Sequence, residues 1–176
     1  MAGSLRKNSY NKMLLRACHE VLPEGGSLEI FDLEGIPPFN QDLEGNLPER
    51  VKLLKKKIRE SDAVLISTPE YNYSIPGVLK NAIDWASRPY GDNVFYGKPA
   101  AIMGASIGML GTARAQYHLR QVLVCLNLYV LNQPEVMVSY AESKFDGEGK
   151  LIDDLTRNRL KDLLMELINW TKKIKG

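Results

Sequence analysis

Three short stretches of the sequence bring together hydroxyl, amide, guanidinium and aromatic side chains, and these suit ligand binding better than acid–base chemistry. The first stretch is GSLRKNSYN, residues 3–11. Its polar side chains lie just before or at the start of a predicted helix: Ser4, Arg6, Ser9 and Asn11. A helix N-terminus offers free N–H groups and a partial positive charge, so this stretch suits a phosphate group. A simple N-cap at Asn8 or Ser9, with Arg6 in solvent, is the alternative.

The second stretch is TPEYNYSIPG, residues 68–77. Two prolines stiffen it, two tyrosines offer flat faces, and Asn72 and Ser74 carry an amide and a hydroxyl. A rigid aromatic loop at the end of a strand suits a planar ligand, because binding residues concentrate on loops held by a rigid scaffold. A tight turn with surface tyrosines is the alternative interpretation.

The third stretch is GASIGMLGTARAQYHLR, residues 104–120, in which Gly104, Gly108 and Gly111 allow a ligand to approach the backbone. It is not a Walker A loop, because Thr112 stands where that motif has lysine. Its first two glycines are also too far apart for the dinucleotide-binding motif. A plain glycine-rich connection is the alternative.

Composition excludes several other functions. The 176 residues are 44% hydrophobic and 25% charged with a formal net charge of +2, which indicates one ordinary domain over 1–176 and gives no sign of nucleic-acid binding. His19 and His118 lack metal-ligand spacing, so we expect no metal site. Cys18 and Cys125 are predicted to be small buried side chains in a reducing compartment. Without a membrane span or signal peptide, the expected location is cytoplasmic.

The elements that must position the three stretches alternate between helices and strands. Helices are predicted over 10–22, 48–60, 76–87, 112–126 and 151–174. Strands are predicted over 27–33, 62–69 and 98–106, and over 128–138 with an interruption at Pro134. This alternation predicts an α/β protein with a parallel sheet between two helical layers, in which ligands bind beyond the carboxyl ends of the strands. That rule selects the loops 3–11, 68–75 and 105–113.

Taken together, GSLRKNSYN, PEYNYSIPGVLKNAIDW and GTARAQYHLRQVL resemble the NADPH-dependent FMN reductase family, on its chromate- and quinone-reducing branch. The resemblance runs from residue 3 through the helix near 126 and implies a flavodoxin-like three-layer α/β/α sandwich. It implies that FMN is bound and NAD(P)H is the co-substrate. The residues implied at the FMN phosphate are Ser4, Arg6, Ser9, Tyr10 and Asn11. Those implied at the isoalloxazine ring are Pro69, Glu70, Tyr71, Asn72 and Ser74 on one side, and Ser106, Gly108 and Gly111 on the other.

In such a site the cofactor carries the chemistry by accepting a hydride at N5, so no protein nucleophile or general base is needed. We expect backbone N–H groups around 71–72 and 106–108 to stabilise the ring. The resulting hypothesis is a ping-pong cycle: NAD(P)H stacks on the open face, reduces FMN and leaves as NAD(P)+, and a quinone, azo compound or chromate-like anion then takes its place. Tyr73 and Arg88 are predicted to line that face.

The helix over 112–126 mixes aromatic, arginine and apolar side chains, which is typical of a subunit interface. The resemblance implies homodimers, often paired into homotetramers. Arg114, Tyr117 and Glu135 are the candidate interface residues, with Glu135 pairing with Arg114 between subunits. An ordinary amphipathic helix with surface polar residues is the alternative.

Three rival functions share these loops: an electron-carrier flavodoxin, a flavin reductase that releases reduced FMN, and a non-redox module that binds a phosphate-bearing ligand. Carrier flavodoxins tend to be acidic, whereas the isoelectric point here is about 8.4. One departure from the family concerns the start of the chain, where only Met1 and Ala2 precede Gly3. The family has an apolar central strand there, so we expect the first strand to be missing from this chain and its start to be incomplete.

Overall fold

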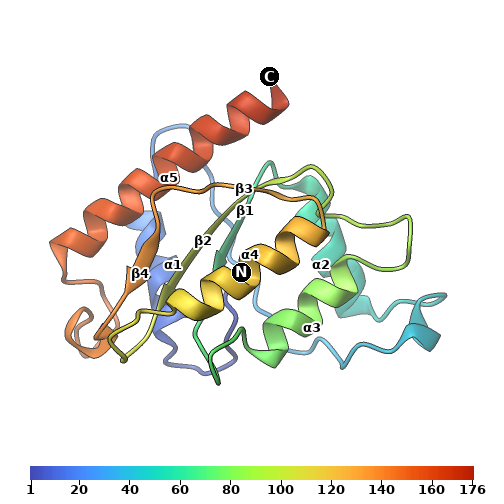
Figure 1. Ribbon diagram of the computed structural model, residues 1–176, viewed down its shortest axis with the longest axis horizontal. Helices are drawn as coiled ribbons and strands as arrows, with labels where there is room; N and C mark the ends of the chain where they lie inside the picture. Colours follow the sequence, from blue (N-terminus) through green and yellow to red (C-terminus); the bar gives the residue numbers. More distant parts are fainter.

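Two buried runs, apolar except for Ser67, form the centre of the sheet as β1 (Val64–Ser67) and β2 (Pro99–Ala105). The computed structural model describes residues 1–176 and pairs these strands in parallel, with Leu65 opposite Ala101. A strand that is apolar throughout is expected where helices cover both faces of a sheet. Figure 1 shows β1 and β2 running side by side between helices.

The other edge of β2 carries two short parallel strands in place of one long one. β3 (Tyr129–Val130) pairs with the start of β2, and β4 (Val136–Val138) pairs with its end. The predicted interruption at Pro134 falls between them and is confirmed, because proline cannot donate a ladder hydrogen bond.

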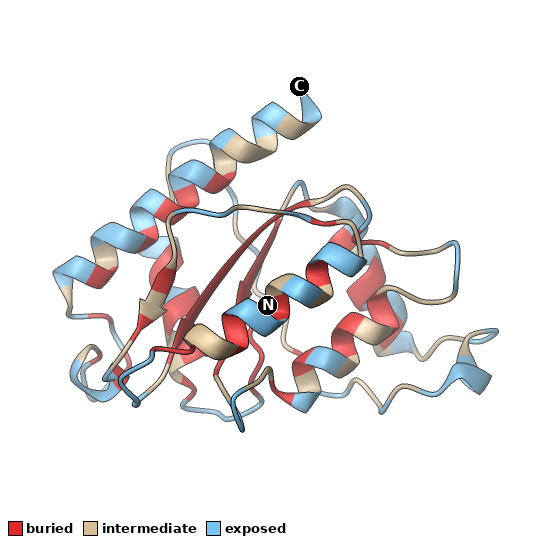
Figure 2. Ribbon diagram, viewed as in Figure 1, coloured by how far each residue is buried: buried red, intermediate tan, exposed pale blue.

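Five α-helices and two short 3-10 helices complete the chain. They are α1 (Tyr10–Glu20), α2 (Glu49–Glu60), α3 (Gly77–Ala86), α4 (Ala113–Cys125) and α5 (Asp154–Lys175), with η1 at Gln41–Leu43 and η2 at Ala141–Ser143. The buried side chains of α1 and α5 pack on one face of the sheet, and those of α2, α3 and α4 pack on the other. Figure 2 shows the strands and the inward helix faces as buried. The predicted α/β class with a parallel sheet is therefore confirmed.

The segment 27–33 corrects one prediction, because it is not a strand of the sheet. Its side chains alternate as a strand would require: Leu28 and Ile30 pack on the side of α1 and α5, whereas Phe31 and Leu33 pack on the side of α2 and α3. The segment lacks a backbone partner, however, because no ladder of hydrogen bonds joins it to the sheet. The alternation of side chains along a segment predicts which of them are buried on each face, but it does not predict whether the backbone pairs with another strand.

The slot of the expected first strand is partly used by the residues at the start of the chain. Ala2 forms a parallel bridge with Ser67, and the Gly3 N–H donates to the Ser67 carbonyl at 2.8 Å. Met1 lies buried beside them, and its amine donates to the Leu65 carbonyl at 2.7 Å. Residues 1–3 therefore extend the sheet next to β1 and lead directly into the first candidate loop.

The two cysteines differ, which corrects a second prediction. Cys18 is buried in the core, and burial raises the pKa of its thiol to about 12. Cys125 is exposed, because it is the last residue of α4 and lies on the outward side of that helix.

No group of three or more His, Cys, Asp or Glu side chains is placed to hold a metal ion. None of the five α-helices combines the length and the apolar composition that a membrane crossing needs.

The close packing at Gly104 provides a test of the sheet's carboxyl edge. A methyl group at this position would overlap the Thr112 hydroxyl and the Thr68 carbonyl oxygen. We expect Gly104→Ala to lower the free energy of unfolding by about 3 kcal/mol, because a backbone atom cannot move aside. Urea unfolding measures the change. Gly147→Ala is the matched control, since nothing lies within 4 Å of its added methyl group; equal stabilities of the two variants would refute this packing.

Candidate functional site

The three candidate loops meet at the carboxyl edge of the sheet, as the alternation of elements predicts. Residues 3–9 lead from the bridge beside β1 into α1, residues 68–76 lead from β1 into α3, and residues 106–112 lead from β2 into α4. A fourth loop, which follows β4, joins them there. The Ser106 N–H donates to the Val138 carbonyl at 2.9 Å, and the Ala141 N–H donates to the Ser106 carbonyl at 3.1 Å.

Asn11 braces this edge from inside α1. Its side-chain oxygen accepts from the Ser67 hydroxyl at 2.9 Å and from the Ala105 N–H at 3.0 Å. Its side-chain nitrogen donates to the Ala105 carbonyl at 2.9 Å. The side chain is buried, and both acceptor positions of its oxygen are used. Asn11 therefore holds the first helix against β1 and β2, and its implied contact with the FMN phosphate stays a prediction.

The start of α1 has the properties of an anion site. Ser9 stands at the N-cap position with an extended backbone, yet its side chain makes no capping hydrogen bond. Serine at this position usually bonds to the N–H groups of the first turn. Here the first-turn N–H groups and the buried Ser9 hydroxyl are both left for another acceptor.

The other polar residues of the first loop surround this helix start. Ser4 is buried, and its hydroxyl accepts from the Arg6 N–H at 3.3 Å. The Arg6 side chain is exposed and lies 5.9 Å from the centre of the Tyr10 ring. Tyr10 in turn stacks at 5.7 Å on Phe145, from the segment after η2. A guanidinium, two hydroxyls and a helix N-terminus thus lie within one short segment.

The second loop is a tight hairpin. Tyr71 and Ser74 exchange two backbone hydrogen bonds of 3.0 Å, and the residues between them, Asn72 and Tyr73, have φ angles of 50° and 66°. Positive φ at both central positions defines a type I′ turn, which asparagine accepts better than tyrosine does. Both tyrosines are exposed, and the Ser74 hydroxyl lies 3.1 Å from His118 Nδ1 on α4.

Glu70 fastens this hairpin to α4. Its nearly buried carboxylate accepts from the N–H groups of Arg114 and Ala115 at 3.1 and 3.2 Å and forms an ion pair with the Arg114 guanidinium. That guanidinium lies 3.7 Å from the centre of the Tyr73 ring. Within the chain the Glu70 carboxylate therefore caps α4, and its implied place beside a planar ring stays a prediction.

The glycine loop is held against β4. Gly111 has a φ of 53°, and an added methyl group would lie 2.7 Å from the Met137 carbonyl carbon. The Gly108 N–H donates to the Ser106 hydroxyl at 3.1 Å, which turns the loop over. Ile107, Met109 and Leu110 are exposed at its tip. Glycine is required at position 111 because a side chain there would overlap the backbone at Met137. The rest of the loop exposes backbone and apolar side chains at the protein surface.

The predicted interface residues have partners within the chain. Arg114 pairs with Glu70, and Tyr117 bonds to Glu135, which raises the pKa of the Tyr117 hydroxyl. Tyr117 remains half exposed on the outer side of α4. Arg88, predicted to line the open face, lies against the Tyr90 ring at 3.8 Å.

The fourth loop was missed by sequence reasoning. Tyr140 is exposed with a φ of 50°, and Ala141 and Phe145 beside it are buried against the site's supporting core. The same rule that selected the other three loops would have selected this one, because it follows the carboxyl end of a parallel strand. Only three residues of β4 pair, so the strand end was difficult to locate.

The Glu70 contacts give a specific test of how the hairpin is held. We expect Glu70→Ala to lower the free energy of unfolding by about 2 kcal/mol, because two N–H groups and a guanidinium lose their shared acceptor. Glu49→Ala is the matched control, since Glu49 is also a carboxylate in a first helical turn but is exposed and pairs only with Lys52. Urea unfolding of both variants measures the difference. A loss of under about 0.5 kcal/mol at Glu70 would mean that the contact does not fasten the loop.

Comparison with known proteins identifies the family of this fold and this set of loops. Residues 1–143 match the NADPH-dependent FMN reductase family. A protein named NAD(P)H-dependent FMN reductase PA1204, from Pseudomonas aeruginosa, is 50% identical over 100% of this chain and 95% of its own. A 2-hydroxy-1,4-benzoquinone reductase from a Burkholderia species is 43% identical over 98% of this chain and 94% of its own.

Among solved structures, the flavoenzyme NAD(P)H:(acceptor) oxidoreductase FerB from Paracoccus denitrificans superimposes with a TM-score of 0.90. It is 38% identical, and the match covers 98% of this chain and 95% of FerB. The family match includes all three loops selected from the sequence. This chain belongs to the NADPH-dependent FMN reductase family.

Proposed function

We propose that this protein is an NAD(P)H-dependent FMN reductase that delivers electrons to quinones. The observation that carries the proposal is the start of α1, where a buried N-cap serine leaves the first-turn N–H groups uncapped. This is the chemistry that a phosphate monoester requires. Family membership supports the same cofactor, and the Burkholderia relative is named for a benzoquinone substrate.

The residues present fit FMN at both of its ends. Ser4, Ser9, Arg6 and the α1 N-terminus would hold the phosphate, with Tyr10 beside them. The hairpin over 71–74 and the loop over 106–111 would hold the ring, because they supply N–H groups from two neighbouring strand ends. When bound, FMN supplies hydride transfer at N5.

The chain's own contribution is positioning and electrostatic stabilisation. Within the ranges 71–72 and 106–108, the N–H groups of Asn72 and Ile107 make no hydrogen bond in the chain, so these two would donate to the ring and favour its reduced, negatively charged form. Pro69 and the type I′ turn keep the hairpin stiff, and the Glu70 carboxylate keeps it on α4. Tyr73 is 66% exposed and would border the face on which NAD(P)H and the acceptor bind in turn. Azo compounds and chromate-like anions are further acceptors that such an open face admits.

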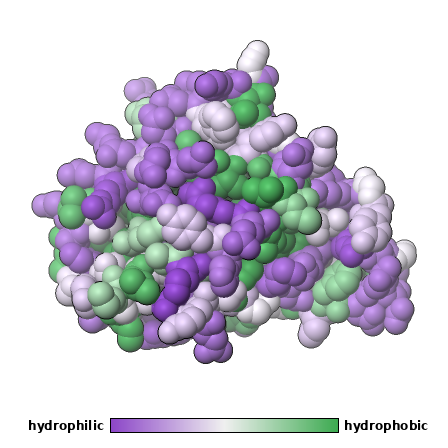
Figure 3. Space-filling model, in the orientation of Figure 1, coloured by the Kyte–Doolittle hydropathy of each residue, from purple (hydrophilic) through white to green (hydrophobic).

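We also propose that α4 forms part of a homodimer or homotetramer interface. Its outer side carries Tyr117 and Val124, which are 51% and 71% exposed. Figure 3 shows apolar patches among polar ones on the face that carries α4. The Tyr117–Glu135 contact leaves both residues near this surface, and light scattering in solution distinguishes monomer, dimer and tetramer.

The two free cysteines favour a cytoplasmic location.

Ser9→Ala tests the phosphate end of the site. We expect the variant to bind FMN about tenfold more weakly, because a hydrogen bond from a hydroxyl to a charged phosphate is lost. Fluorescence quenching of added FMN measures the affinity. Ser87→Ala is the control, since its hydroxyl bonds only to the Asp84 carbonyl at the far end of α3. Unchanged FMN affinity in Ser9→Ala would place the phosphate elsewhere.

Steady-state kinetics test whether NAD(P)H and the quinone bind in turn at the same face of the site. If the oxidised product NAD(P)+ must leave before the quinone binds, double-reciprocal plots at several fixed quinone concentrations should give parallel lines. Intersecting lines would instead show that both substrates bind together, which would contradict alternate use of one face. The variant Cys125→Ser, changed at an exposed residue that ends α4, serves as a control and should give the same pattern as the parent.

A further inference from the structure

The segment 139–145, which follows β4, connects the two ends of the candidate site. At one end it is held to the glycine loop, because the Ser106 carbonyl accepts from the Ala141 N–H at 3.1 Å. At the other end Phe145 stacks on Tyr10, beside the proposed phosphate site. Figure 1 shows the segment, in orange, next to the yellow loop that leads into α4. Side chains that point outward from this segment therefore border the site.

Tyr140 stands in this segment with a backbone conformation that tyrosine rarely adopts. Its φ of 50° and ψ of 47° lie in the left-handed region, which strains a bulky side chain more than it strains glycine or asparagine. The Tyr140 carbonyl accepts from the Ser143 N–H at 3.0 Å and from the Ser143 hydroxyl at 2.9 Å. The fold therefore holds Tyr140 in a strained conformation at the edge of the site.

No contact of the Tyr140 ring within the chain offsets this strain. The side chain is 54% exposed, and its ring stacks neither on another ring nor on a cation. The only side-chain hydrogen bond at this residue goes to its backbone carbonyl. Other tyrosines near the site do have partners, since Tyr10 stacks on Phe145 and Tyr117 bonds to Glu135. A strained residue whose ring has no partner in the chain indicates a role toward a ligand.

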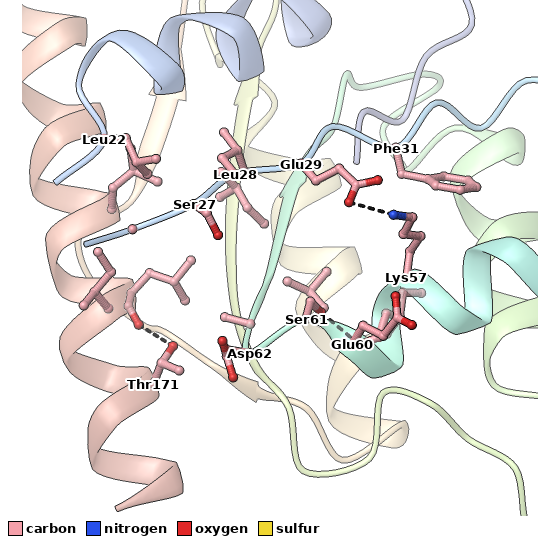
Figure 4. A pocket seen from close by; sticks show the side chains of 18 of the residues that line it. Leu22, Ser27, Leu28, Glu29, Phe31, Lys57, Glu60, Ser61, Asp62 and Thr171 are labelled. Carbon is pink, nitrogen blue, oxygen red and sulfur yellow. Dashed lines mark hydrogen bonds and ion pairs between the residues drawn. The ribbon is translucent and has the colours of Figure 1, made fainter. Parts of the chain in front are cut away.

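The largest cavity of the protein does not hold that ligand. It has a volume of about 680 Å³ and lies on the amino-terminal side of β1. Figure 4 shows Ser27, Leu28 and Glu29 at this cavity, with Thr171 of α5 below them. None of the residues that line it belongs to the loops at the carboxyl edge. A ligand of Tyr140 therefore lies on the open side of the candidate site.

The acceptors that this open side admits differ in shape. A quinone is a flat ring that can stack on a tyrosine, whereas a compact inorganic anion has no flat face to offer. Resting on the proposed function, we propose that Tyr140 is a specificity-determining residue that stacks on flat-ring acceptors and favours them over compact anions. Tyr140 takes no part in the transfer itself, in which the quinone gains a hydride from the reduced flavin and a proton from water and becomes the hydroquinone.

Two substitutions separate the ring of Tyr140 from its backbone conformation. Tyr140→Asn removes the ring but keeps a residue that accepts the left-handed region, and Tyr140→Phe keeps the ring. Each protein is loaded with FMN, reduced anaerobically with one equivalent of NADPH, and mixed in a stopped-flow instrument with 1,4-naphthoquinone or with ferricyanide. The return of the flavin absorbance measures the second-order rate constant for each acceptor.

We expect Tyr140→Asn to lower the rate constant for naphthoquinone about fivefold, because a stacked pair of rings is lost, and to leave that for ferricyanide unchanged. Tyr140→Phe should match the parent with both acceptors. Tyr96→Asn is the matched control and should also match the parent, since Tyr96 is exposed but lies just before β2, at the opposite edge of the sheet. An unchanged naphthoquinone rate constant in Tyr140→Asn, or equal losses with both acceptors, would overturn the proposal.

Two further measurements on Tyr140→Asn exclude other roles of the ring. Its FMN affinity and its unfolding temperature should be no lower than those of the parent. Weaker FMN binding would place the ring on the cofactor, and a lower unfolding temperature would give it a packing role, so either result would overturn acceptor selection. A parent protein whose flavin NADPH does not reduce would refute the proposed function and the role of Tyr140 with it. A parent that is reduced and reoxidised, with Tyr140→Asn unchanged, would refute only the role of Tyr140.

Discussion

The site at the carboxyl edge depends above all on one buried amide. Asn11 joins α1 to the ends of β1 and β2 through its hydrogen bonds with Ser67 and Ala105. Each of these three elements leads into or out of a ligand loop, so their relative positions are set by a side chain rather than by the ladder alone. Buried polar groups that are fully satisfied restrict a structure more than apolar contacts do, because a shifted arrangement would leave them unpaired. The carboxyl edge can therefore be preorganised before any cofactor binds.

The site residues divide into those that face the ligand and those that hold the loops. Asn11 and Glu70 hold the loops, and the close approaches of Gly104 and Gly111 do so too. The α1 N-terminus, Ser9 and the hairpin tyrosines are left to face the ligand.

Much of this arrangement could be predicted from the sequence, because apolar runs, helix periodicity and the edge rule need only local information. The helices and the two central strands appear near their predicted positions, and three of the four loops were selected. The sequence does not predict which group each segment or side chain pairs with inside the folded chain. The segment 27–33 alternates like a strand but has no ladder, Glu70 turns to α4, and Asn11 turns inward. Each of these outcomes is decided by residues far away in the sequence, which a local pattern does not contain.

The account rests on the claim that these loops bind FMN and make it reducible by NAD(P)H. The most direct measurement is an anaerobic visible spectrum of the protein reconstituted with FMN, before and after one equivalent of NADPH and then after a benzoquinone. The account predicts that the flavin absorbance bleaches with NADPH and returns in full with the quinone. A protein that takes up no FMN, or whose bound flavin keeps its absorbance when NADPH and NADH are added, would contradict it.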